Sequence, residues 1–269
     1  MARTTLDLPT EKMIAYAEDG IGWMVFNNPE RHNALNAEMQ AAIPLIYAAF
    51  GDDDSVRVVV MRGAGERAFV SGADIGEFDK REAAAKAGTP LPTARAWDDA
   101  LYQRLGKPVI AMIRGYALGG GVLTMLKADI RVASDDAQFG VPAAKLGVGY
   151  AMSGVKALVD VVGPANAREI LLTGDRFSAQ DALRMGLINR VVPAAELEQA
   201  VVKLAGIIAG NAPLTIRAVR AAVDELVKPA AEQDEARVAD LVAIAAASED
   251  FREGRRAFQE KRKPDFTGR

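Results

Sequence analysis

Short apolar runs alternate with amphipathic stretches in the first part of the chain. Four of these runs predict strands, at residues 13–18, 21–26, 56–61 and 109–113. The first two are separated by Asp19-Gly20, a dipeptide typical of a hairpin turn. Asn36 is a candidate N-cap for a helix whose apolar residues recur at helical spacing. Strands that alternate with helices predict βαβ units and a largely parallel sheet.

The pattern becomes wholly helical after residue 194. Helices are expected at residues 195–209, 214–227, 230–247 and 250–262, each rich in alanine and amphipathic. Just before them, Ser178-Ala-Gln-Asp181 resembles a capping signal for a short helix, and residues 187–192 predict a strand. We therefore predict an α/β core over residues 1–193 and a helical C-terminal subdomain over residues 194–269.

One internal segment has a different character. Residues 81–93 have no anchoring apolar face and end in Gly88-Thr-Pro90-Leu-Pro92, a cluster of helix and strand breakers. We expect this segment to be mobile. A helix is expected to follow it, over residues 93–105.

Composition narrows the class of protein. The formal net charge of -3 argues against a general nucleic-acid binder, which is usually basic. The absence of cysteine excludes disulfides, thiolate nucleophiles and cysteine metal sites. No apolar run approaches the roughly 20 residues needed to span a bilayer, and the N-terminus lacks the apolar stretch of a signal peptide. We expect a cytoplasmic protein with neither a membrane nor a nucleic-acid partner.

A glycine-rich turn is the first candidate for chemistry. Residues 115–121 (Gly-Tyr-Ala-Leu-Gly-Gly-Gly) follow a predicted strand and open a predicted helix, so their backbone N–H groups can face a ligand. The turn lacks the last glycine of a dinucleotide fingerprint and the Lys-Ser/Thr of a P-loop. A tight structural turn and an anion or oxyanion site remain as alternatives.

The order and spacing of several motifs resemble the crotonases, the enoyl-CoA hydratase/isomerase superfamily. These motifs lie at residues 33–36 (Asn-Ala-Leu-Asn), 69–75 (Phe-Val-Ser-Gly-Ala-Asp-Ile), 107–110, 115–121, 137–140, 172–175, 186–192 and 258–264. The resemblance covers residues 13–269. It implies a crotonase (ClpP-like) ββα spiral core with a helical C-terminal subdomain, assembled as a homotrimer or a dimer of trimers. It also implies an enzyme of fatty acid metabolism that acts on acyl-CoA.

The same resemblance implies a site for the thioester. The backbone N–H groups of Ala73 and Gly120 would hold the carbonyl oxygen, and Ala34, Leu35, Asp74 and Ile75 would contact coenzyme A. Donors fixed in advance at a developing oxyanion are worth about 10²–10³ in rate each. Neither a metal nor a separate cofactor is implied, because coenzyme A is part of the substrate.

This chain differs from the family at the positions that carry out hydration. Leu123 and Ala143 occupy the positions of the two glutamates that orient and activate water in the hydratases. Ala151 occupies the position of the nucleophilic aspartate of the dehalogenases. Tyr150 lies in a segment that resembles bacterial methylmalonyl-CoA decarboxylases, although those enzymes carry a histidine in place of Ala73 and a glutamate in place of Leu123.

These departures favour a lyase that forms a thioester enolate by losing CO₂, since that step needs no base. Tyr150 is the candidate proton donor, and a core tyrosine is the alternative reading. A hydratase or isomerase with a relocated acid/base residue and a catalytically silent acyl-CoA-binding protein remain alternatives. RNA binding is a further idea, and the acidic net charge and the lack of a lysine-rich helix argue against it.

Other side chains are weaker candidates. Arg31, His32 and Lys107 are possible phosphate contacts, although solvation at the surface is the better explanation for each of them. Lys145 is a second polar candidate beside the acyl group. Met152, with the two residues that replace the glutamates, predicts an apolar acyl pocket.

Overall fold

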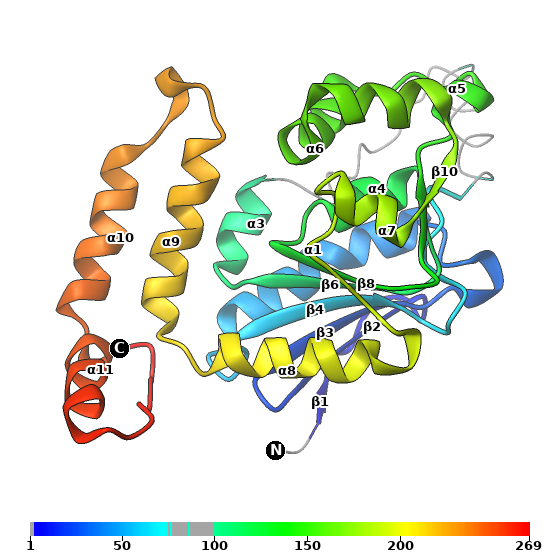
Figure 1. Cartoon of the computed structure of the whole chain (residues 1–269). Coiled ribbons are helices and arrows are strands. Elements are labelled where there is room, and N and C mark those ends of the chain that lie inside the picture. The colour runs from blue at the N-terminus through cyan, green and yellow to red at the C-terminus, as the bar shows by residue number, and fades with distance from the viewer. Residues whose placement is uncertain (1–2, 75, 77–85, 87–98) are drawn as a thin grey trace.

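Two sheets form the centre of the molecule (Figure 1). The computed structural model describes residues 3–74, 76, 86 and 99–269. The larger sheet has seven strands, in the order β1 (Thr4–Thr5), β2 (Met13–Glu18), β3 (Ile21–Phe26), β4 (Val58–Gly63), β6 (Val109–Ile113), β8 (Ile130–Ser134) and β11 (Arg190–Val192). The smaller sheet has four strands, in the order β10 (Arg176–Ser178), β9 (Gln138–Gly140), β7 (Tyr116–Leu118) and β5 (Ala68–Val70).

Parallel pairing dominates both sheets. In the larger sheet every neighbouring pair from β3 to β11 is parallel, and only β1 and β2 run antiparallel to their neighbours. In the smaller sheet β10 alone pairs antiparallel, with β9. The predicted, largely parallel α/β core is thus confirmed.

Helices connect and cover the strands. In chain order they are α1 (Ala37–Asp52), α3 (Asp99–Leu105), α4 (Gly120–Met125), α5 (Ala143–Leu146), α6 (Met152–Thr173), α7 (Ala179–Arg184), α8 (Leu197–Ala209), α9 (Pro213–Leu226), α10 (Glu235–Ala247) and α11 (Glu249–Glu260). Short 3₁₀ turns lie at Pro29–Arg31, Ala194–Glu196 and Ala230–Glu232. As expected, the Asn36 side chain caps α1, and Ser178 and Asp181 form a capping box on α7.

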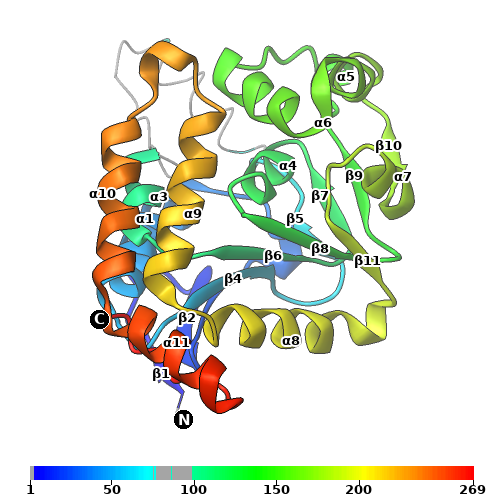
Figure 2. The ribbon, with the colours of Figure 1, turned by 60° about the vertical axis from the view of Figure 1, so that its left-hand side comes forward.

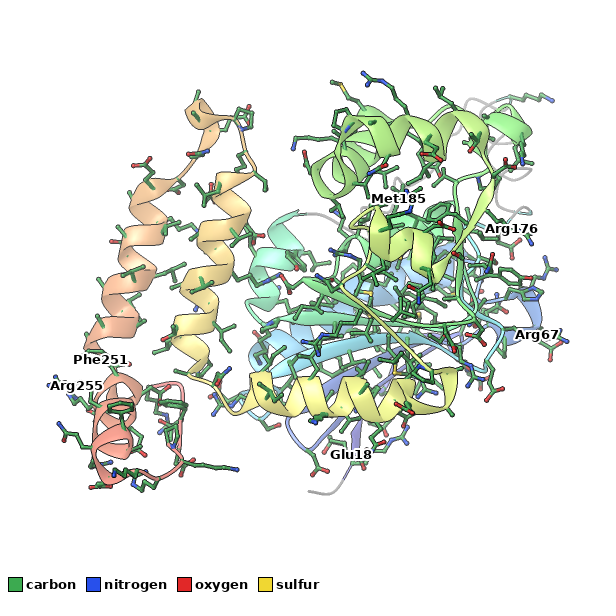
Figure 3. The ribbon with its side chains drawn as sticks, in the orientation of Figure 1. Glu18, Arg67, Arg176, Met185, Phe251 and Arg255 are labelled. Atoms are coloured by element: carbon green, nitrogen blue, oxygen red, sulfur yellow. The ribbon has the colours of Figure 1, made fainter. Side chains whose placement is uncertain are left out.

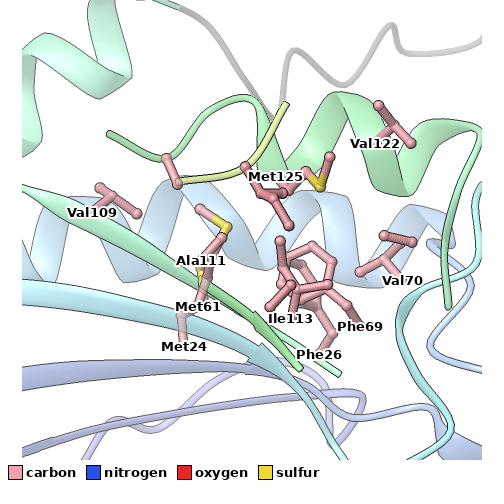
Figure 4. Close-up of a cluster of buried hydrophobic side chains, with 14 of the residues drawn as sticks. Met24, Phe26, Met61, Phe69, Val70, Val109, Ala111, Ile113, Val122 and Met125 are labelled. Carbon is pink, nitrogen blue, oxygen red and sulfur yellow. The ribbon is translucent and has the colours of Figure 1, made fainter. Parts of the chain in front are cut away.

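The central strands of the larger sheet, β3, β4, β6 and β8, are largely buried, and their alternate side chains point to opposite faces. On one face, residues such as Met24 and Met61 pack against α1 and α4. Figure 4 shows this cluster, with Met125 of α4 close to the strands. On the other face, Trp23 and Val60 pack against the apolar side of α8.

The last three helices lie beside this core rather than over it (Figure 2). Helices α9 and α10 form an antiparallel pair, and no residue of α10 is buried. An ion pair fixes the pair to the core, because Arg220 of α9 donates to Asp129 at 3.0 Å. Tyr102 of α3 donates to the same carboxylate at 2.8 Å, and the Arg220 guanidinium lies 3.6 Å from the Tyr102 ring centroid.

Several boundaries differ from the prediction. Strand β4 begins two residues later than expected. Strand β7 occupies part of the segment predicted as a glycine turn, and β5 and β8 lie where no strand was predicted. The strand expected at residues 187–192 is limited to β11. Residues 81–85 and 87–93, most of the segment expected to be mobile, lie outside the described residues, as does the first part of the helix expected at residues 93–105. The division at residue 193 stays a prediction, and α8 packs on the sheet of the core.

Within the described ranges, no single helix is long and apolar enough to cross a membrane. Only α8, counted from Ala194, and α9 together reach that length and composition, as a pair bent by 104°.

Candidate active site

The glycine turn joins the small sheet to α4. Gly119 has φ 54° and ψ −115°, a conformation that other residues rarely adopt, and its N–H donates to the Gly140 carbonyl at 2.8 Å. A Cβ added at Gly121 would lie 1.8 Å from the Val70 carbonyl oxygen. Glycine therefore lets the start of α4 approach the end of β5, which leads directly to Ala73.

The two expected oxyanion donors lie next to each other. A Cβ built on Gly120 would lie 3.5 Å from the Ala73 nitrogen. Within the described residues, neither of these two backbone N–H groups donates a hydrogen bond to another group of the protein. Two adjacent, unused donors are an arrangement that can bind one carbonyl oxygen.

The loop at residues 33–36, predicted to contact coenzyme A, is hydrogen-bonded to the segment that contains Ala73. Leu35 forms a parallel β-bridge with Ala73, its N–H donates to the Gly72 carbonyl at 2.8 Å, and its carbonyl accepts from Asp74 at 2.9 Å. Ala34 and Leu35 are themselves buried. Four of the expected contacts thus lie on two bridged backbone segments, Ala34 and Leu35 on one and Ala73 and Asp74 on the other. Ile75 lies outside the described residues.

A fully buried amide holds this loop in place. The Asn33 side chain donates to the carbonyls of Ala64 at 3.0 Å and Ala68 at 2.7 Å, and accepts from the Asn28 backbone at 2.9 Å. Asn33 was noted in the sequence only as part of a motif. Its anchoring role could not be read from the sequence, because the two carbonyls to which it donates lie more than thirty residues away.

Tyr150 lies beside the glycine turn. Its hydroxyl is 3.6 Å from the position of a Cβ added at Gly119, the residue before Gly120. The side chain is half-buried, and the hydroxyl makes no hydrogen bond with any described residue. Burial raises the pKa of the Tyr150 phenol above its ordinary value, so the group is a protonated donor at neutral pH.

The surroundings of Tyr150 are apolar where the hydratases carry carboxylates. Leu123 is half-buried on α4, and Ala143 is buried at the start of α5. Met152, also expected to make the pocket apolar, is the first residue of α6 and is 87% exposed. The apolar character of the site therefore rests on Leu123 and Ala143.

The weaker polar candidates have other partners. Lys107 donates to the carbonyls of Phe50 and Asp53 at the end of α1, so it caps a helix rather than a phosphate site. Burial lowers the pKa of this lysine. Lys145 forms an exposed ion pair with Asp175.

Of the two basic candidates of the loop, Arg31 is exposed and His32 is half-buried. Arg31 pairs with Asp74 at 3.4 Å, and Asp74 also accepts from the Gly76 backbone at 2.9 Å. The His32 ring lies edge-on to Tyr116, with 6.2 Å between the ring centroids. In the described part of the chain, no group of three or more His, Cys, Asp or Glu side chains could hold a metal ion.

Comparison with known proteins places most of the chain in one group. A family model described as enoyl-CoA hydratase/isomerase matches residues 16–269. A crotonyl-CoA hydratase from Syntrophomonas wolfei is 34% identical, over 95% of this chain and 98% of that protein. A carnitinyl-CoA dehydratase from Proteus mirabilis is 38% identical, over 88% and 91%. The crystal structure of an enoyl-CoA hydratase/carnithine racemase from Magnetospirillum magneticum superposes with a TM-score of 0.88 and 35% identity, over 97% of each chain.

Proposed function

Because the chain belongs to the enoyl-CoA hydratase/isomerase family and is an acyl-CoA enzyme of the crotonase type, we propose that Ala73 and Gly120 stabilise a thioester enolate. The observation that carries this proposal is the pair of adjacent backbone N–H groups with no partner in the described part of the protein. Negative charge that develops on the thioester oxygen would be met by donors already in position, so no reorganisation is needed.

The proposed reaction is the loss of CO₂ from a 2-carboxyacyl thioester. The bond between the α-carbon and the carboxylate breaks, and its electron pair forms the enolate. CO₂ leaves, and the α-carbon then takes a proton from the Tyr150 hydroxyl, which solvent reprotonates. Two features support this order of steps: Tyr150 lies beside Gly119, and apolar side chains stand at positions 123 and 143. An apolar surrounding also disfavours a carboxylate and favours neutral CO₂.

The names of the relatives favour a second candidate function. The crotonyl-CoA hydratase and the carnitinyl-CoA dehydratase are named for adding or removing water. A hydratase or isomerase in this chain would need an acid/base residue at a new position, since Leu123 and Ala143 carry no ionisable group. General acid–base catalysis contributes about 10²–10⁴-fold per group. Crotonyl-CoA hydration should therefore be very slow or undetectable.

A panel of thioesters followed by mass spectrometry separates these functions. We expect the mass of malonyl-, methylmalonyl- or ethylmalonyl-CoA to fall by about 44 Da, the mass of one CO₂, while crotonyl-CoA remains unchanged. Efficient hydration of crotonyl-CoA would instead establish the second candidate. Binding of every thioester without turnover would identify a catalytically silent acyl-CoA-binding protein.

The assembly and location belong to the same proposal. We expect a homotrimer or a dimer of trimers, with contacts made by the C-terminal helices. Exposed apolar side chains on α9 and α11 support this expectation, among them Leu226 at 72% exposed and Phe258 at 86%. A cytoplasmic location, with no nucleic-acid or membrane partner and no cofactor beyond the coenzyme A of the substrate, rests on the composition of the sequence and on the family.

A further inference from the structure

Three residues from two parts of the chain meet beside the glycine turn. A Cβ added at Gly154 would lie 3.2 Å from Leu123 Cδ1, 3.7 Å from Leu123 Cδ2 and 3.8 Å from Tyr150 Cδ1. Leu123 comes from α4, Gly154 from the first turn of α6, and Tyr150 from the segment that leads into α6. The leucine and the tyrosine ring therefore border the same small space above Gly154.

The backbone gives no reason for a glycine at position 154. Gly154 is helical, its φ is not positive, and its N–H donates to the Ala151 carbonyl at 3.0 Å. Alanine is the better helix former at such a position. A methyl group there would be tighter against Leu123 than the usual separation of about 3.5–4.0 Å between carbon atoms. Leu123 is thus the side chain that a methyl group at position 154 would press against first.

We propose that Leu123 and Gly154 are positioning residues for Tyr150: Leu123 fills the space above Gly154 and holds the ring so that the hydroxyl lies beside Gly119. The proposal rests on the proposed role of Tyr150 as the proton donor to the enolate. It gives the leucine at position 123 a function of its own. Leu123, which occupies the position of a hydratase glutamate, would thus orient the hydroxyl of Tyr150, the proposed proton donor.

Fluorine NMR tests this placement without any substrate. The chain has five tyrosines, so labelling with 3-fluorotyrosine gives five resonances, and Tyr150→Phe identifies the one from Tyr150. Leu123→Ala and Gly154→Ala alter the two sides of the shared space. Gly206→Ala in α8 is the matched control, because a Cβ there meets nothing within 4 Å.

We expect the Tyr150 resonance to shift in Leu123→Ala and in Gly154→Ala, with the other four unchanged. All five should stay in place in Gly206→Ala. In the double variant the added methyl fills part of the space left by the leucine, so the shift should be smaller than the sum of the two single shifts.

An unchanged Tyr150 resonance in folded Leu123→Ala and Gly154→Ala proteins would overturn the proposal. If Leu123→Ala does not fold, Leu123→Val makes the same test with a smaller change in volume. A shifted resonance in an enzyme that turns over no thioester would count against the proposed function and leave the positioning role standing. With an accepted thioester, Leu123→Ala should lower kcat several-fold at nearly constant KM, since the binding donors of Ala73 and Gly120 are untouched.

Discussion

At the scale of single residues, the account depends most on the Tyr150 hydroxyl. Tyr150→Phe keeps the ring and its packing and removes only the proton donor. We expect acyl-CoA binding to be unchanged and turnover to fall by about 10²–10⁴, the usual contribution of one acid or base. Isothermal titration and steady-state kinetics measure the two effects. Turnover equal to that of the unmodified enzyme would make Tyr150 a packing residue only.

The pH dependence follows from the same group. Burial raises the pKa of Tyr150 above its ordinary value of about 10, so the phenol keeps its proton throughout the neutral range. A proton donor is lost as pH rises through its pKa. We therefore expect kcat to show no loss from this group below pH of about 10. A descending limb near neutral pH that disappears in Tyr150→Phe would contradict the assignment.

At the scale of elements, the C-terminal helices and the strands β2, β3, β4 and β6 were predictable, because each carries a local pattern of apolar residues. The strands of the small sheet were not. Each has three residues, and each is defined by partners far along the chain, as when Tyr116 pairs with both Ala68 and Gln138. Residues 152–173, where no element was predicted, form α6, whose pattern is interrupted at Gly163, with φ 73° and ψ 166°.

The candidate site likewise depends on contacts between residues that are far apart in the sequence. The resemblance names Ala73 and Gly120 as donors, but the sequence alone contains no reason for their approach, which depends on the fit of Gly121 against Val70. Gly154 carried no signal at all, because its importance arises only from the neighbouring Leu123.

The loop anchored by Asn33 gives a prediction at this scale. Asn33→Gly suits the φ of 56° and removes the amide that satisfies the Ala64 and Ala68 carbonyls. A buried group left without its hydrogen bond costs about 1–3 kcal/mol. We expect a lower melting temperature and weaker acyl-CoA binding, because Ala34 and Leu35 follow directly. Asn166→Ala removes an amide that donates to one helix carbonyl, and is the control expected to keep binding. Unchanged acyl-CoA affinity in Asn33→Gly would separate this loop from the coenzyme A site.

At the scale of the whole molecule, the C-terminal helices leave apolar surface uncovered. Figure 3 shows Phe251 and Arg255 of α11 on the side of the molecule opposite Arg67 and Arg176. A cavity of about 460 Å³ lies between α11, the start of α9 and the C-terminal segment, and Phe251, Phe258 and Phe266 line it. On α9, Val219, Val223 and Leu226 form an exposed row at helical spacing.

We expect a second and a third copy of the chain to cover this surface. Light scattering at micromolar concentration should give three or six times the chain mass of 28.6 kDa. The double change Val223→Lys with Leu226→Lys should reduce the mass toward one chain, while Leu45→Lys on α1, also exposed, is the control. A single-chain mass for the unmodified protein would contradict this assembly.

The central claim is that two backbone N–H groups polarise a thioester carbonyl. The most direct measurement is the infrared stretching band of ¹³C-labelled acetyl-CoA, with the label in the carbonyl, bound to the enzyme. Hydrogen bonds to the oxygen weaken the C=O bond, so we predict a band at lower frequency than in water. Gly120→Pro removes one donor, and should shift the band back and reduce turnover by about 10²–10³. A bound thioester whose carbonyl band equals that of the free compound, in both proteins, would contradict the account.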